Sequence, residues 1–146
     1  MNNVQLEKSS FSIKDVRLIR LNFSQKKSIE EGFSLNLGIK SSYTKTSSEE
    51  GEKLIALNIG VQVKLEDKEP SDCFAIMEVE MGGIFCYEQE LDKKLLPNLA
   101  SILYSYIRPI VAQTFAISKL PSIDIPILNL SNLKIEEILS SEDENI

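Results

Sequence analysis

Two glutamates are the residues of this chain whose spacing comes nearest to catalytic chemistry. Glu78 and Glu80 lie two positions apart, so on a strand both carboxylates project from one face, where they could serve as general acid and base. The chain contains no histidine, which removes the most common general base and the Ser-His and Cys-His nucleophile pairs. No partner base, nucleophile or metal-binding cluster accompanies the two glutamates in the sequence. We therefore expect that the protein is not an enzyme.

The two cysteines and the paired glycines also lack the neighbours that a reactive site needs. Cys73 and Cys86 lie thirteen positions apart on one expected strand, too far for a disulfide, and they form no Cys-x-x-Cys zinc motif. We expect two reduced core thiols and no cofactor. Gly82-Gly83 is not followed by the Lys-Ser/Thr of a phosphate-binding loop. It instead predicts that the strand breaks there, at a bulge, a bend or a close approach of backbones.

The composition is that of one globular domain with an acidic balance. Of the 146 residues, 42% are hydrophobic and 26% are charged, and the formal net charge is −6. We expect residues 1–9 to be a flexible N-terminus, residues 10–139 a single domain and residues 140–146 an acidic tail. The negative charge disfavours nucleic acid and anionic membrane surfaces as partners. Neither a signal peptide nor a membrane-spanning run is evident, so we expect a cytoplasmic protein.

Period-two alternation predicts the sheet that would position these residues. Apolar residues alternate with polar ones over residues 33–43, 55–65 and 73–81, which predicts three strands with an apolar face each. Residues 11–23 alternate as well, but the apolar face changes near Asp15 and again near Leu18, which predicts bulges or strong coiling. Short polar loops between these four strands favour an antiparallel meander.

A change of period after the fourth strand predicts the helical part of the fold. Apolar residues at three- and four-residue steps predict a helix from about Leu95 to Leu120, followed by an extended segment bounded by Pro121 and Pro126. Ser131 can cap a short last helix whose apolar residues are Leu133, Ile135, Ile138 and Leu139. The expected fold is α+β: a four-stranded antiparallel sheet, a long C-terminal helix packed on one face, and a short final helix.

Two blocks of the sequence resemble the SecB family of bacterial export chaperones. The run from Phe74 to Phe85 is similar to the family's strand that ends in Gly-Gly-Ile-Phe, here Gly82-Gly83-Ile84-Phe85. The second block is Tyr106-x-Arg108 followed by Pro121-x-Ile123-x-Ile125-Pro126-x-x-Asn129. It resembles the family's tyrosine-x-arginine helix and the proline-bounded segment after it. Both blocks have the order that they have in the family.

The resemblance implies an ATP-independent chaperone, a holdase, that binds unfolded preproteins and passes them to the motor ATPase SecA for export. It also implies a homotetramer made of two dimers. Ile76 and Glu78 match part of the family's surface for SecA, whereas the family's two acidic first-strand positions fall on Arg20 and Ser24. SecB-like proteins that serve antitoxins also exist, so a chaperone dedicated to the antitoxin of a toxin–antitoxin system is the alternative.

The residues favour a similar interpretation, because the expected sheet and helix have more apolar surface than one short domain can bury. We expect the surplus to serve self-association, as a dimer or a tetramer, and a groove between sheet and helices that binds non-native polypeptides. The predicted groove residues are Phe33, Leu35, Leu37, Leu57, Ile59, Ile84, Phe85, Leu128 and Leu133. Arg108 is expected to be a structural hydrogen-bond or ion-pair donor. The alternative from another class is a small-ligand binding module with a closed pocket in each monomer.

Overall fold

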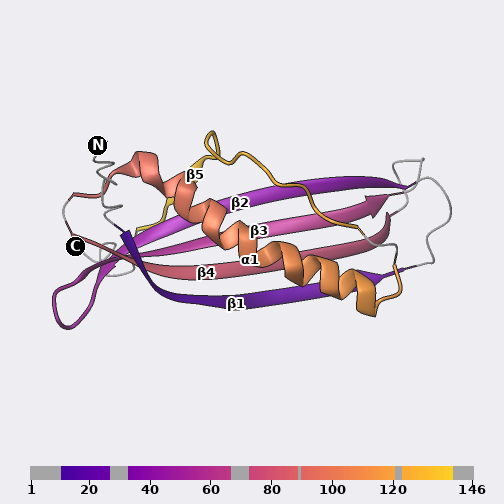
Figure 1. The fold of residues 1–146 in the computed structure, drawn as a ribbon, viewed down its shortest axis with the longest axis horizontal. Coiled ribbons are helices and arrows are strands. Elements are labelled where there is room, and N and C mark those ends of the chain that lie inside the picture. The colour runs from indigo at the N-terminus through magenta and orange to yellow at the C-terminus, as the bar shows by residue number, and fades with distance from the viewer. Residues whose placement is uncertain (1–10, 27–32, 67–72, 89, 121–122, 140–146) are drawn as a thin grey trace, which may run out of the picture.

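A computed structural model of the chain describes residues 11–26, 33–66, 73–88, 90–120 and 123–139. The predicted flexible N-terminus, the predicted acidic tail and Pro121 lie outside the described residues. The elements are β1 (Phe11–Gln25), β2 (Ser34–Ser47), β3 (Lys53–Glu66), β4 (Cys73–Tyr87), a short 3-10 helix (Lys93–Leu95), α1 (Leu96–Ile117) and β5 (Ile135–Glu137). The predicted α+β class is confirmed, with five strands instead of four (Figure 1).

The strands form one sheet in the order β1-β4-β3-β2-β5. β2, β3 and β4 are consecutive antiparallel neighbours, as the predicted meander requires. The meander is wrong for β1, which pairs antiparallel with β4 at the far side of the sheet and not with β2. β4 is thereby flanked by a long strand on each side, so both of its edges are paired.

The predicted changes of face along β1 are confirmed. Its pairing with β4 shifts register between Ile13 and Asp15 and again between Leu18 and Arg20. Each shift adds one residue to β1, which is the signature of a β-bulge and turns the side chains that follow toward the other face. As a result, β1 exposes an unusual number of large apolar side chains, namely Ile13, Leu18, Ile19 and Leu21.

The paired glycines mark a close approach and not a break, because β4 runs without interruption from Cys73 to Tyr87. A Cβ atom on Gly82 would lie 2.5 Å from Cδ1 of Ile19, the extra residue of the second β1 bulge. A Cβ atom on Gly83 would lie 2.7 Å from the ring of Phe85 and 2.9 Å from Cδ2 of Leu103 on α1. Neither position has room for a side chain, so Gly83 allows the helix to lie directly on the sheet.

α1 lies on one face of the sheet, over β3 and β4 (Figure 1). The odd-numbered residues from Ile55 to Leu65 and from Ala75 to Tyr87 point toward it and are buried, in agreement with the predicted alternation. On the helix, residues at three- and four-residue steps are buried: Leu96, Leu99, Ala100, Leu103, Tyr104, Ile107, Val111 and Phe115. The even-numbered residues form an outer face that α1 does not cover. No described helix is long and apolar enough to cross a membrane.

After α1, residues 123–134, here called the return segment, run back beside the helix over the β2 side of the sheet (Figure 1). They are extended except for a turn at residues 131 and 132. The return segment ends in β5, which pairs parallel with β2 and aligns Ser41 with Ile135 and Tyr43 with Glu137. The predicted final helix is therefore wrong. The apolar spacing of Leu133 and Ile135 fits a strand as well as a helix, and the edge of β2 supplies the hydrogen bonds that select the strand.

Candidate polypeptide-binding surface

Two side chains of α1 hold the return segment in place. The Tyr104 hydroxyl donates to the carbonyl oxygen of Pro126 at 2.7 Å, and Nε of Arg108 donates to that of Ile125 at 3.1 Å. Ile125 and Leu130 anchor the segment by burial in the core. Burial raises the pKa of Tyr104, so its hydroxyl stays protonated and remains a donor. Arg108 thus makes a structural contact, whereas Tyr106 of the same motif is 48% exposed.

Three of the nine predicted groove residues lie inside the core. Leu57, Ile59 and Phe85 each have 0% of their surface exposed, because they face α1 from β3 and β4. They have no surface on which a polypeptide could be bound in this structure. A fourth, Ile84, is half-buried on the outer face of β4, so the sheet separates it from the return segment.

The other five predicted groove residues lie on the helix side, at β2 and the return segment. Phe33, Leu35, Leu37, Leu128 and Leu133 are all partly buried and pack against the core. Ile39 of β2 shares these properties, and together the six side chains are called the β2 surface. Leu133 also lines a hollow of about 290 Å³ with Tyr43, Pro97 and Ile135, at the β5 end of this surface. The β2 surface is thus half-buried and apolar.

Ile127 is the exposed residue that the sequence analysis missed. It lies in the return segment next to Pro126, and 82% of its surface is exposed, although Ile125 two residues earlier is buried. No periodic signal in the sequence separates the two isoleucines, because both occupy the same parity of an extended segment. Ile127 adds apolar surface beside the β2 surface.

The outer face of the sheet has a different character. A hollow of about 760 Å³ lies there, and residues of all five strands or their flanks line it. Its charged lining is balanced: Arg20, Lys40, Lys134, Glu78, Glu80 and Glu136. Nη2 of Arg20 lies 3.4 Å from Oε2 of Glu78, and Gln62 donates to the other oxygen of that carboxylate at 3.2 Å. This face is polar and internally paired.

The two glutamates considered for acid–base chemistry take part in this pairing. Glu78 is bonded to Arg20 and Gln62, and Glu80 accepts a hydrogen bond from Asn58 at 3.4 Å. Both carboxylates therefore have structural partners on neighbouring strands. Within the described ranges, no group of three or more Cys, Asp or Glu side chains could hold a metal ion.

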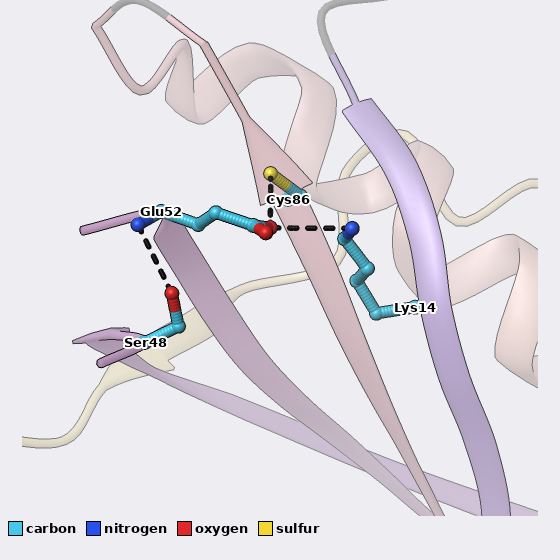
Figure 2. Close-up of polar contacts among 4 residues, drawn as sticks. All are labelled: Lys14, Ser48, Glu52 and Cys86. Atoms are coloured by element: carbon cyan, nitrogen blue, oxygen red, sulfur yellow. Dashed lines mark hydrogen bonds and ion pairs between the residues drawn. The ribbon is translucent and has the colours of Figure 1, made fainter. Parts of the chain in front are cut away.

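Both cysteines are free and half-buried, and the surroundings of Cys86 make it a poor nucleophile. Figure 2 shows its thiol donating to Oε2 of Glu52 at 3.5 Å, while Nζ of Lys14 lies 3.2 Å from the same oxygen. Ser48 accepts a hydrogen bond from the backbone of Glu52 at 3.0 Å. Burial and the Glu52 carboxylate both raise the pKa of Cys86, so the thiol stays protonated. The cluster is a structural link between β1, β4 and the β2–β3 turn.

Comparison with known proteins identifies the fold. A scan against models of protein families finds no match, and a search of curated proteins finds none either. Among solved structures, the chain is similar to the SecB-like chaperone Rv1957 of Mycobacterium tuberculosis, solved in complex with a ChAD peptide from the antitoxin Rv1956 HigA1. The TM-score is 0.69 at 19% sequence identity, and the match covers 82% of this chain and 91% of that one. The chain therefore has a SecB-like fold, as its two sequence blocks indicate.

Proposed function

We propose that this protein is an ATP-independent chaperone that binds a non-native antitoxin. The observation that carries this proposal is the fold shared with Rv1957, whose solved complex contains a peptide from an antitoxin. The β2 surface supplies a matching physical feature, since it presents apolar side chains that α1 and the return segment leave half-buried.

Half-buried side chains suit reversible binding. Complete burial of a Leu or Phe side chain contributes roughly 1.5–3 kcal/mol of free energy. The side chains of the β2 surface are already partly buried in the free protein, so client binding adds only the remainder. One short client segment is therefore held weakly at one site. Several sites on one oligomer would raise the avidity for a long unfolded chain by ~10²–10⁴. Strong retention and release without ATP are then compatible.

We propose that the oligomer is a dimer, or a homotetramer made of two dimers. Two further groups of exposed apolar side chains support self-association. β1 contributes Leu18, Ile19 and Leu21, and the outward side of α1 contributes Tyr106 and Ile117. The β1 group lies on the other side of the sheet from β2, so subunit contacts made there need not compete with client contacts.

The outer face of the sheet favours the antitoxin role over the export role. The resemblance to SecB assigns Ile76 and Glu78 to the contact with SecA, and both lie on the outer side of β4. Here Arg20 occupies one of the family's acidic positions and pairs with Glu78, while Ser24 lies opposite Ile76 in the register. The charge that an acidic docking face needs is therefore partly neutralised. SecA is accordingly not the expected partner.

Two assays test this proposal. In the first, light scattering follows the aggregation of a chemically denatured polypeptide with and without the protein, in the absence of ATP. We expect aggregation to be suppressed near one client per oligomer; no suppression would contradict a chaperone function. In the second, an array of overlapping peptides from antitoxins and secretory precursors of the source genome is probed with the protein. Binding to antitoxin peptides is expected. Binding confined to precursors, with complex formation with SecA, would favour the export role.

A further inference from the structure

The hollow on the outer face of the sheet carries its charges in a fixed order across the strands. In the register, Gly60 of β3 lies between Lys40 of β2 and Glu80 of β4. Lys134, which directly precedes β5, lines the same hollow beyond Lys40. Arg20 of β1 lies opposite Glu80 and lines it at the other end. From β5 to β1, this row of the hollow therefore reads cation, cation, glycine, anion, cation.

The two sides of the hollow carry opposite net charge. The β2 and β5 side contributes two lysines and one glutamate, whereas the β4 and β1 side contributes two glutamates and one arginine. The pairing described above is incomplete on both sides. Among the described residues, Glu80 has a single hydrogen bond, from Asn58 at 3.4 Å, and neither Lys40 nor Lys134 has an ion-pair partner. The hollow thus has a cationic side and an anionic side, with β3 between them.

Two glycines form the floor between these sides. Gly38 and Gly60 line the hollow, and a Cβ atom on either one would meet nothing closer than 3.9 Å. Neither has a positive φ that would require glycine. Gly82 is different, because Ile19 covers it and leaves no room for a Cβ atom. Contacts within the chain therefore explain Gly82 but not Gly38 and Gly60. Glycine inside a strand often marks a site where a ligand approaches the backbone closely.

The dimensions of the floor indicate the size of the ligand. Two strand spacings, roughly 10 Å, separate the backbones of β2 and β4. An extended chain of three residues spans about the same distance, at most about 10 Å. Asn58 and Gln62 lie on β3 on either side of Gly60, and both line the hollow. Their side-chain amides offer donors and acceptors to peptide groups. The hollow of about 760 Å³ has room for such a chain.

We propose that this hollow is a second binding site, for a short peptide of about three residues with free termini. The peptide carboxylate lies beside Lys40 and Lys134, the terminal ammonium group lies beside Glu80, and the middle residue lies over Gly60. Recognition depends on the two terminal charges and not on apolar side chains. The site lies on the face of the sheet opposite to α1 and the β2 surface. It is therefore independent of the proposed chaperone function.

Blocked peptides and matched variants test each contact separately. NMR follows the titration of the full chain with trialanine, with its N-acetylated form and with its C-amidated form. Trialanine should shift the amide signals of Gly38 and Gly60, and each block should weaken binding about two- to fivefold, the range of partly exposed ion pairs. In Glu80→Gln, N-acetylation should cause no further loss. In the double variant Lys40→Gln/Lys134→Gln, amidation should cause no further loss.

Several outcomes would overturn the proposal. Equal binding of the three peptides, or shifts confined to other residues, would exclude the site. A block that costs as much in its matched variant as in the original protein would exclude the assigned contact. Gly60→Val fills the floor and should weaken binding of trialanine about tenfold or more, and equal binding would also exclude the site.

Two controls accompany the Gly60→Val variant. Its urea midpoint should stay unchanged or rise, because valine favours strands and a Cβ atom has room at this position. Suppression of client aggregation should be the same in all the variants as in the original protein. A protein that suppresses aggregation but does not bind trialanine overturns this proposal alone, and the opposite result overturns only the chaperone proposal.

Discussion

The two sides of the sheet end in edges of opposite character. β1 carries Lys14, Asp15, Arg17 and Arg20, and two bulges interrupt its register with β4. β2 is uncharged from Ser34 to Ile39 and keeps one register with β3 from Ser34 to Ser47. Charges and bulges oppose the regular backbone pairing that an added strand needs. The comparison shows how one small sheet can carry two sides that differ in charge and in regularity of pairing.

The largest expected effect separates the core from the β2 edge. Leu57 is fully buried under α1, so Leu57→Ala should lower the free energy of unfolding by about 2–5 kcal/mol, measured by urea denaturation. Leu37 is half-buried, and Leu37→Ala should cost clearly less while it weakens peptide binding. Equal losses of stability in the two variants would show that β2 belongs to the core and would remove the distinction.

A charge placed on each edge tests the comparison directly. Leu37→Asp places a carboxylate on the β2 surface and should weaken binding of a short apolar peptide about tenfold or more, measured by fluorescence anisotropy. The matched variant on β1, Leu18→Asp, should leave the peptide affinity unchanged, since Leu18 is already exposed. A short peptide occupies one site, so the result does not depend on the oligomeric state. A stronger effect of Leu18→Asp would assign the client to β1.

The return segment sharpens the comparison, because it lies on the β2 side only. Tyr104→Phe removes the hydrogen bond to Pro126 and should cost about 0.5–1.5 kcal/mol of stability in thermal unfolding. Hydrogen exchange of the Ile127 and Leu128 amides should become faster at the same time. Tyr106→Phe makes the same chemical change on an exposed side chain and serves as the control. Matching behaviour of the two variants would show that the Tyr104 hydroxyl does not hold the segment.

The smallest expected effect concerns the first bulge of β1, which directs Lys14 to Glu52. The ion pair with Lys14 lowers the pKa of Glu52 below its ordinary value of 4.5, so the folded state releases this proton more readily than the unfolded chain. The stabilisation is present above pH 4.5 and is lost as the pH falls through the lowered value. Glu52→Gln should reduce the melting temperature slightly at neutral pH. At a pH below the lowered pKa of Glu52, the variant and the original protein should melt at the same temperature. A constant difference at both pH values would exclude the ion pair as its cause.

The sequence allowed the main layers of the fold to be predicted, because alternation and helical spacing are local signals. The faces of β2, β3 and β4, the bulges of β1 and the long helix are examples. The position of β1 beside β4 was not predictable in the same way, since a polar connection can either form a hairpin or cross the end of a sheet. β5 was missed because its three residues gain their partner only from tertiary structure.

For a related reason, the sequence could not show which of the nine candidate groove residues reach the surface. Apolar parity identifies the face of a strand but not its place in the sheet. Leu57 and Leu37 have the same parity and lie on the same face of the sheet. However, Leu57 lies under α1, whereas Leu37 lies beside the return segment. Strand order decides which of them reaches the surface. The pairing of Arg20 with Glu78 likewise depends on β1 lying next to β4, which no local pattern encodes.

The shortness of β5 has a consequence for the outer edge of β2. β5 covers Ser41 to Tyr43 and closes the edge of β2 at that point. Three aligned residues contribute few backbone hydrogen bonds, so the buried Leu130 just before them helps to hold β5 in place.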